Sequence, residues 1–212
     1  MPEITAIFWD VGGVLLSNAW DHTERNRALV QFELDEVDFN DRHQMLVSSF
    51  ERGKITLDEY LERTIFYRTR TFSRDAFKDY MFSLSHPKND VLELARALAR
   101  SGKYLMSALN NESKDLNLYR IQAFHLSEIF SLFVSSCFVG LRKPEAAIYR
   151  LAMDITQRAP EECCFIDDRE LNLECASQMG LHVIQMQGAE QLRADLGKLG
   201  VAIDPNNPAT TT

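Results

Sequence analysis

Residues 7–16 read IFWDVGGVLL, an apolar run that ends in a carboxylate and two glycines. Such a run followed by a glycine turn is typical of a buried strand that leads into a loop. Asp10 would then lie at the carboxyl end of the strand, at the edge of a parallel sheet where ligands bind. Asp10 equally fits an acid that merely opens a glycine turn, so this stretch alone leaves both interpretations open.

Short apolar runs recur along the rest of the chain. After a first run at 4–9, they lie at 104–108, 130–134, 163–166 and 182–186. Stretches with helical periodicity separate most of these runs. This alternation predicts an α/β fold, with a Rossmann-like parallel sheet that carries helices on both faces.

Capping and breaking residues mark the helices that we expect between these strands. Asp90 precedes VLELARALARSG, so we expect it to cap a helix that Gly102 ends in a left-handed conformation. Pro144 is expected to start a second helix, in EAAIYRLAMDI. A third helix is expected at 170–179, closed by Gly180.

Residues 17–85 are almost wholly helical in pattern and too long for a plain connection. We expect them to form a small helical cap inserted after the first strand. Within this stretch, Thr56 and Glu59 have the spacing of a capping box. The expected domains are a core at 1–16 and 86–203, the cap at 17–85, and a Pro- and Thr-rich tail at 204–212 that we expect to be disordered.

The formal net charge of −8 argues against nucleic acid or an anionic membrane as a partner and favours a small diffusible substrate. No apolar run is long enough to span a bilayer, and the N-terminus lacks the basic start of a signal peptide. We therefore expect a cytoplasmic protein. The cysteines lack the spacing of a zinc site and are expected to be reduced packing residues: Cys137, Cys163, Cys164 and Cys175.

Two further stretches place chemically useful side chains near strand ends. In FIDDREL, residues 165–171, the adjacent Asp167 and Asp168 follow an apolar strand, and a shared cation would relieve their repulsion. Oxygen ligands of this kind suit magnesium. In VGLRKPEAAIY, residues 139–149, Lys143 would balance carboxylates and hold a phosphoryl oxygen. A solvated acidic turn is the less attractive alternative for the first stretch, because both acids directly follow buried residues. A lone Lys such as Lys143 is usually a surface residue.

Taken in order, these stretches resemble the haloacid dehalogenase superfamily, and the resemblance covers nearly the whole chain. That family has a nucleophilic Asp after its first strand, matched by Asp10, and a Lys before a Pro-headed helix, matched by Lys143. Its acidic pair is matched by Asp167 and Asp168. FERGKIT, GLRKPEAAIY and DDRELN are most similar to the subgroup with a helical cap after the first strand. This subgroup includes bacterial glucose-1-phosphate phosphatases and the amino-terminal phosphatase domain of soluble epoxide hydrolases.

The resemblance implies a magnesium-dependent hydrolase that cleaves a small phosphorylated metabolite. Asp10 would attack phosphorus and form an aspartyl-phosphate. Lys143 would neutralise the nucleophile and the transferring phosphoryl group. The Mg²⁺ ion would be bound by oxygen atoms of Asp10, Asp168 and the Gly12 carbonyl. Asp167 would bind the ion directly or through water.

The resemblance also implies roles for the loop after Asp10 and for a residue beyond the acidic pair. The backbone N–H groups of Gly12 and Gly13 would cradle the phosphoryl oxygens. Asn172 is a candidate to orient the acidic loop, although an Asn on a helix surface fits the pattern equally well.

Gly12 is the first departure from the family pattern. Most family phosphatases have a second Asp at this position, which protonates the leaving oxygen and then activates water. General acid-base help contributes about 10²–10⁴ in rate. We therefore expect substrates with acidic leaving groups, such as aryl and sugar 1-phosphates, to be favoured. The subgroup commonly carries Gly here, which implies that hydrolysis is still possible.

Leu109 is the second departure. In YLMSALNNES, residues 104–113, it takes the place of the Ser or Thr whose hydroxyl holds a phosphoryl oxygen in the family. Ser107 lies two residues earlier on the same face and is a poorly placed substitute. Asn110 or Asn111 would offer an amide donor instead.

The departures leave an alternative to the phosphatase, a catalytically impaired protein of the same fold that binds a phosphorylated ligand or a protein partner. Dehalogenation is disfavoured, because two adjacent acids would repel a carboxylate substrate. Phosphonate cleavage needs a cap lysine, and the nearest, Lys54, is more simply an exposed residue. Trp20, His22 and Arg25 are plausible lining residues of a substrate site, and equally plausible surface or core residues. The oligomeric state stays open.

Overall fold

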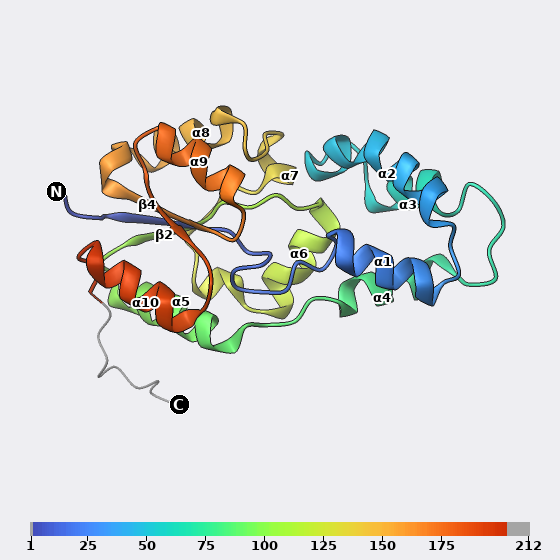
Figure 1. Ribbon diagram of the computed structural model, residues 1–212, viewed down its shortest axis with the longest axis horizontal. Coiled ribbons are helices and arrows are strands. Elements are labelled where there is room, and N and C mark those ends of the chain that lie inside the picture. Colours follow the sequence, from blue (N-terminus) through green and yellow to red (C-terminus); the bar gives the residue numbers. More distant parts are fainter. Residues whose placement is uncertain (1, 203–212) are drawn as a thin grey trace.

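The computed structural model describes residues 2–202 and has a five-stranded parallel sheet at its centre (Figure 1). The strand order is β3-β2-β1-β4-β5, so the first strand lies in the middle of the sheet. All four pairings are parallel. The strand bounds are β1 Ala6–Trp9, β2 Leu105–Ala108, β3 Leu132–Phe133, β4 Cys163–Asp167 and β5 His182–Gln185. Each of the five expected apolar runs therefore coincides with a strand, although β4 extends one residue beyond its run, to Asp167.

Helices cover both faces of the sheet, which confirms the expected fold class. Helices α5 and α10 lie on one face, and α8 and α9 lie on the other (Figure 1). The helices of the core are α5 Asn89–Ser101, α6 Lys114–Ala123, α7 Ser136–Val139, α8 Ala146–Thr156, α9 Glu170–Gln178 and α10 Ala189–Lys198, with short 3₁₀ turns at Leu126–Glu128 and Pro160–Glu162.

Strand β1 explains why the sheet is buried on both faces. Ile7 and Trp9 pack with residues of α5 and α10, while Ala6 and Phe8 pack with residues of α8 and α9. Successive strand side chains point to opposite faces, so a continuous apolar strand needs cover on both. The adjacent cysteines of β4 divide in the same way, with Cys163 in one hydrophobic cluster and Cys164 in the other.

Four helices between β1 and α5 form a separate layer, which we call the cap helices: α1 His22–Gln31, α2 Glu36–Glu51, α3 Leu57–Thr64 and α4 Arg74–Ser83. They lie beyond the carboxyl ends of the strands, on the side away from the N-terminus (Figure 1). Their interior is rich in aromatic rings, with Trp20 edge-on to both Phe39 and Phe77. The expected capping box of Thr56 and Glu59 is present at the start of α3.

Polar contacts fasten the cap helices to the core. Arg142, before α8, pairs with Glu51 at the end of α2 at 2.9 Å. Arg52 donates to the Gly140 carbonyl at 2.9 Å and pairs with Glu145. These contacts close the cap helices over the carboxyl edge of the sheet.

Two expected helix starts are wrong. Helix α5 begins at Asn89, and its N-cap is Lys88; Asp90 lies inside the first turn, where its carboxylate accepts a bond from the N–H of Val91. Helix α8 begins at Ala146, two residues after Pro144, because Glu145 takes the extended N-cap conformation. The left-handed stop at Gly102 is confirmed. The tail expected at 204–212 lies outside the described residues.

Among residues 2–202, none of the helices combines the length and the apolar character that a membrane crossing needs.

Candidate active site

Three carboxylates meet at the carboxyl edge of the sheet. Asp10 directly follows β1, Asp167 ends β4, and Asp168 is the next residue. The parallel pairing of β1 with β4 brings them together, and the N–H of Asp10 donates to the Ile166 carbonyl at 2.8 Å. One oxygen from each acid lies within 4.8 Å of the others. The structure thus places the acids that the sequence singled out in one cluster.

Lys143 lies inside this cluster and is only 1% exposed. Its ammonium group is 3.1 Å from Asp10 Oδ1 and 2.5 Å from Asp167 Oδ2. Burial alone would lower the pKa of Lys143, but the carboxylates of Asp10 and Asp167 outweigh burial and raise it. Lys143 therefore carries its charge between the two acids.

Two asparagines hold the cluster in place. Asn172 of α9 donates its amide to both oxygens of Asp167, at 3.0 Å each. Asn111 brackets the backbone of Lys143, accepting from its N–H at 2.8 Å and donating to its carbonyl at 2.9 Å. Asn172 is therefore a buried residue bonded to Asp167 and not an Asn on a helix surface, and its role in orienting the acidic loop stays a prediction.

The charges of the cluster fit a bound cation. Burial raises the pKa of Asp10 to about 8, an effect that Lys143 opposes and that Asp167 and Asp168 reinforce. One ammonium group is therefore too little for three carboxylates. Asp168 Oδ1 is buried and has no hydrogen-bond partner within residues 2–202. A divalent ion with a preference for oxygen would satisfy both the free oxygen and the missing charge.

The oxygens of Asp167 differ from those of Asp10 and Asp168. Its Oδ1 accepts from the N–H of Arg169 and from Asn172, and its Oδ2 accepts from Lys143 and Asn172. A carboxylate has about four lone-pair directions. Because protein donors occupy Asp167 so fully, its geometry fits contact with a cation through water better than direct contact.

Gly12 and Gly13 form the turn after Asp10, and the structure gives them different constraints. Gly13 has a φ of +75°, and a Cβ built there would lie 2.0 Å from Asp168 Oδ2. Only glycine fits this conformation and this close approach. Gly12 has no such backbone constraint, and a Cβ there would lie 3.1 Å from Asn18 Oδ1 and 3.5 Å from Arg120 Nη1.

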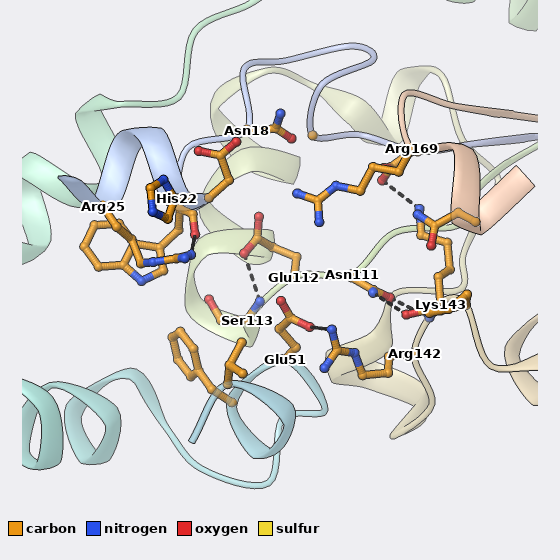
Figure 2. Close-up of a pocket in the computed structure, with 18 of the residues that line it drawn as sticks. Asn18, His22, Arg25, Glu51, Asn111, Glu112, Ser113, Arg142, Lys143 and Arg169 are labelled. Atoms are coloured by element: carbon orange, nitrogen blue, oxygen red, sulfur yellow. Dashed lines mark hydrogen bonds and ion pairs between the residues drawn. The ribbon is translucent and has the colours of Figure 1, made fainter. Parts of the chain in front are cut away.

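A cavity of about 480 Å³ opens between the acidic cluster and the cap helices. Asp10, Gly12 and Lys143 line it from the core. Trp20, His22 and Arg25, whose roles the sequence left open, line it from the segment that enters the cap and from α1 (Figure 2). This volume suits a small molecule.

Several arginines line the cavity, and most of them were not among the site residues expected from the sequence. Arg142 is paired with Glu51, whereas Arg25 and Arg169 have no carboxylate within salt-bridge distance among residues 2–202. Arg169 lines the cavity, and its side chain projects into the open space (Figure 2). The sequence signal for Arg169 was its position directly after the acidic pair.

A buried ion pair, also missed from the sequence, lies at the inner wall. Arg120 of α6 is 1% exposed, and its Nη1 is 3.0 Å from Glu112 Oε2. Burial raises the pKa of Glu112 to about 7, although Arg120 opposes the rise. Arg120 lies four residues from Leu116 and from Phe124 on a helix, and a charge at that spacing in an apolar stripe signals a buried partner.

The proposed substitutes for the family hydroxyl at Leu109 are otherwise engaged. Asn110 donates to Asn117 Oδ1 at 3.0 Å and accepts from Ser135 at 2.7 Å, so its amide binds protein groups, and it does not line the cavity. Ser107 donates to the adjacent Ala108 carbonyl. Asn111 lines the cavity, but both ends of its amide hold the backbone of Lys143. Lys54 is exposed and does not line the cavity.

Comparison with known families and sequences gives one consistent picture. The family model described as "haloacid dehalogenase-like hydrolase" matches residues 4–180. Flavin mononucleotide hydrolase 1 of Arabidopsis thaliana, named as a chloroplast protein, is 30% identical over 162 residues, which is 76% of this chain and 65% of that protein. Bifunctional epoxide hydrolase 2 of Rattus norvegicus is 31% identical over 121 residues, 56% of this chain and 22% of that protein. The chain thus spans under two thirds of either relative.

Solved structures share the fold. A predicted HAD-like hydrolase from Porphyromonas gingivalis has a TM-score of 0.74 at 20% identity, covering 93% of this chain and 98% of that chain. An HAD family enzyme from Bacteroides thetaiotaomicron, solved with magnesium and inorganic phosphate, has a TM-score of 0.67 at 22% identity, covering 87% and 94%.

Proposed function

Because this chain belongs to the haloacid dehalogenase-like hydrolases, we propose that it is a magnesium-dependent phosphatase of a small phosphorylated metabolite. The observation that carries this proposal is the acidic cluster of Asp10, Asp167 and Asp168, with Lys143 held inside it. The cluster brings three carboxylates and one ammonium group together beside one small cavity, which supports a nucleophile, a fixed positive charge and a cation site there.

In this mechanism the chain's own groups do most of the work. A carboxylate oxygen of Asp10 bonds to phosphorus as the bond to the leaving oxygen breaks, which forms an aspartyl-phosphate, and water then hydrolyses it to phosphate and free Asp10. Lys143 neutralises charge on the nucleophile and on the phosphoryl oxygens. Backbone N–H groups of the turn at Gly12 and Gly13 donate to those oxygens. A magnesium ion held by Asp10, Asp168 and the Gly12 carbonyl would add positive charge there, with Asp167 in contact through water.

The relatives support a phosphate ester as the substrate class. The Arabidopsis relative is named for hydrolysis of flavin mononucleotide, and the Bacteroides structure contains magnesium and phosphate. We propose that residues 17–85 act as the cap that covers the cavity, with Trp20, His22 and Arg25 facing the leaving group. A cytoplasmic location, and the expectation of neither nucleic acid nor membrane as a partner, stay predictions.

The test is phosphate release from a panel of phosphorylated metabolites and 4-nitrophenyl phosphate, with magnesium and with EDTA. We expect release only with magnesium. Asp10→Asn should remove it, because an amide does not attack phosphorus. Asp154→Asn, the same change at an exposed residue of α8, should keep it.

A protein that binds inorganic phosphate or a phosphorylated ligand but releases no phosphate from the panel would contradict this function. That result would favour the catalytically impaired alternative. Equal release by Asp10→Asn would instead show that Asp10 is not the nucleophile.

A further inference from the structure

Position 12 is a glycine and has no side chain to serve as an acid, but a guanidinium group lies near it. A Cβ there would lie 3.1 Å from Asn18 Oδ1 and 3.5 Å from Arg120 Nη1. The same Nη1 donates to Glu112 Oε2 at 3.0 Å. One guanidinium group therefore lies next to both position 12 and a carboxyl group.

Glu112 is held firmly and faces the cavity. Its N–H donates to Ser136 at 3.0 Å, and its Oε1 accepts from the N–H of Ser113 at 2.9 Å. Arg120 is fixed in turn by Ser17 and Ser85, which flank the cap helices. Figure 2 shows the Glu112 carboxyl group projecting into the open space of the cavity. A group fixed by so many bonds reaches a substrate without reorganisation.

From this geometry we propose that Glu112 is the general acid and base of the phosphatase reaction. The inference rests on the proposed function and extends it to one further catalytic residue. It changes the expectation drawn from Gly12, because alkyl phosphates, whose leaving oxygen needs a proton, also become substrates.

The proton transfers balance over the two steps. In the first, Asp10 bonds to phosphorus, the bond to the leaving oxygen breaks, and that oxygen takes the proton of the Glu112 carboxyl group. In the second, a water oxygen bonds to phosphorus and gives a proton to the Glu112 carboxylate. The bond between phosphorus and Asp10 then breaks, which releases phosphate and restores both carboxyl groups to their starting forms.

The charged neighbours of Glu112 agree with both transfers. Burial raises its pKa to about 7; Arg120 on α6 opposes the rise, and Glu51 on α2 reinforces it. A group with a pKa near neutrality is available both as an acid and as a base. His22 on α1 and Arg169 before α9 are among the other titratable residues that line the cavity.

A purely structural role for Glu112 is the competing explanation, in which it only neutralises Arg120. The two explanations differ in how the rate depends on the leaving group. A lost proton donor slows alkyl phosphates, whose leaving alkoxides are basic, far more than 4-nitrophenyl phosphate. A lost counter-ion disturbs the site without regard to the leaving group.

The experiment measures kcat/KM with magnesium for 4-nitrophenyl phosphate and for an alkyl phosphate, in the wild type and in Glu112→Gln. We expect the ratio of aryl to alkyl rates to widen by about 10²-fold or more in the variant. Glu174→Gln, the same change at an exposed residue of α9, should keep the wild-type ratio. Glu112→Asp keeps the charge beside Arg120 and retracts the carboxyl group, so its ratio should fall between those of the wild type and Glu112→Gln. If Glu112→Gln does not fold, Glu112→Asp replaces it in the test.

An unchanged ratio in Glu112→Gln, or in Glu112→Asp where only that variant folds, overturns the inference and leaves the proposed function standing. Absence of magnesium-dependent release from 4-nitrophenyl phosphate in the wild type is a different result. It contradicts the proposed function itself, and Glu112 then has no reaction to serve.

Discussion

The floor and the roof of the cavity are built in different ways. The floor is the carboxyl edge of the sheet, where Asp10 and Asp167 follow directly from two paired strands. The roof consists of the cap helices. Which of their residues line the cavity depends on how the aromatic interior of the cap packs. On the floor, position in the chain decides position in space, because parallel strands end together. In the roof, only the packed tertiary structure decides which side of each helix faces the cavity.

The electrostatic contrast is equally clear. The floor concentrates three acids around one lysine, whereas the roof is lined by Arg25 and, at its meeting with the core, by the paired Arg142 and Glu51. The floor therefore holds more negative than positive charge, which a bound cation would offset. Under the proposed function, the floor would carry out the chemistry and the roof would face the leaving group.

Removing the ammonium group of Lys143 should have the largest effect on stability. Lys143→Met leaves Asp10 and Asp167 facing each other without their ammonium group, so we expect a loss of about 3–5 kcal/mol in the free energy of unfolding without magnesium. Urea unfolding measures this loss. Lys198→Met breaks an exposed pair with Asp195 and should cause no measurable change. Equal stabilities of the two variants would contradict the importance given to the floor.

The two glycines of the floor should respond unequally to the same substitution. Gly13→Ala puts a Cβ 2.0 Å from Asp168 Oδ2 at a positive φ, so we expect a loss of about 2–4 kcal/mol in the free energy of unfolding and loss of turnover. Gly12→Ala meets its first neighbour at 3.1 Å and should cost about 1 kcal/mol or less. Denaturant curves and phosphate release distinguish the two, and a reversed order would refute this assignment of the turn.

The roof should weaken in mild acid. His43 of α2 contacts the Tyr60 hydroxyl at 2.7 Å, and burial followed by the charge of Arg25 lowers its pKa from 6.5 to about 4. Between these values the unfolded chain binds a proton that the folded chain does not, so stability is lost as pH falls.

Comparing unfolding at pH 7 and pH 5 isolates this effect. The wild type should lose about 2 kcal/mol more than His43→Gln, because the unfolded chain gains about 1.4 kcal/mol for each pH step below the pKa of its free histidine. Raised pKa values at Asp10 and Glu112 act in the opposite direction but are common to both proteins. Identical pH dependence in the two proteins would show that His43 does not resist protonation in the folded cap.

The sequence predicted the floor well because its signals are local. An apolar run that ends in an acid locates Asp10 and Asp167 without knowledge of the rest of the fold, and the sheet order then brings them together. Lys143 was found because it precedes a proline. The wrong N-cap at Asp90 shows the limit of local rules, since the helix begins earlier, with Lys88 as its N-cap and Asn89 as its first residue.

The inner wall of the cavity was missed because its signals are not local. Glu112 and Arg120 acquire their meaning only when α6 packs beside the strand ends and the linkers at Ser17 and Ser85 close on the guanidinium group. The surroundings of Asn110 were missed for a similar reason, because Asn117 of α6 accepts from its amide donor and Ser135, from a distant turn, donates to its amide oxygen. Such pairings depend on tertiary contacts that periodicity does not encode.

The most direct test of the central claim is to locate the phosphoryl group during turnover. Wild-type protein mixed with magnesium and 4-nitrophenyl phosphate would be quenched in acid, digested and mapped by mass spectrometry. We predict a phosphoryl group on the peptide that contains Asp10, on Asp10 itself, and none when EDTA replaces magnesium. Sustained turnover with the phosphoryl group on another residue, or with none trapped while Asp10→Asn remains active, would contradict the account.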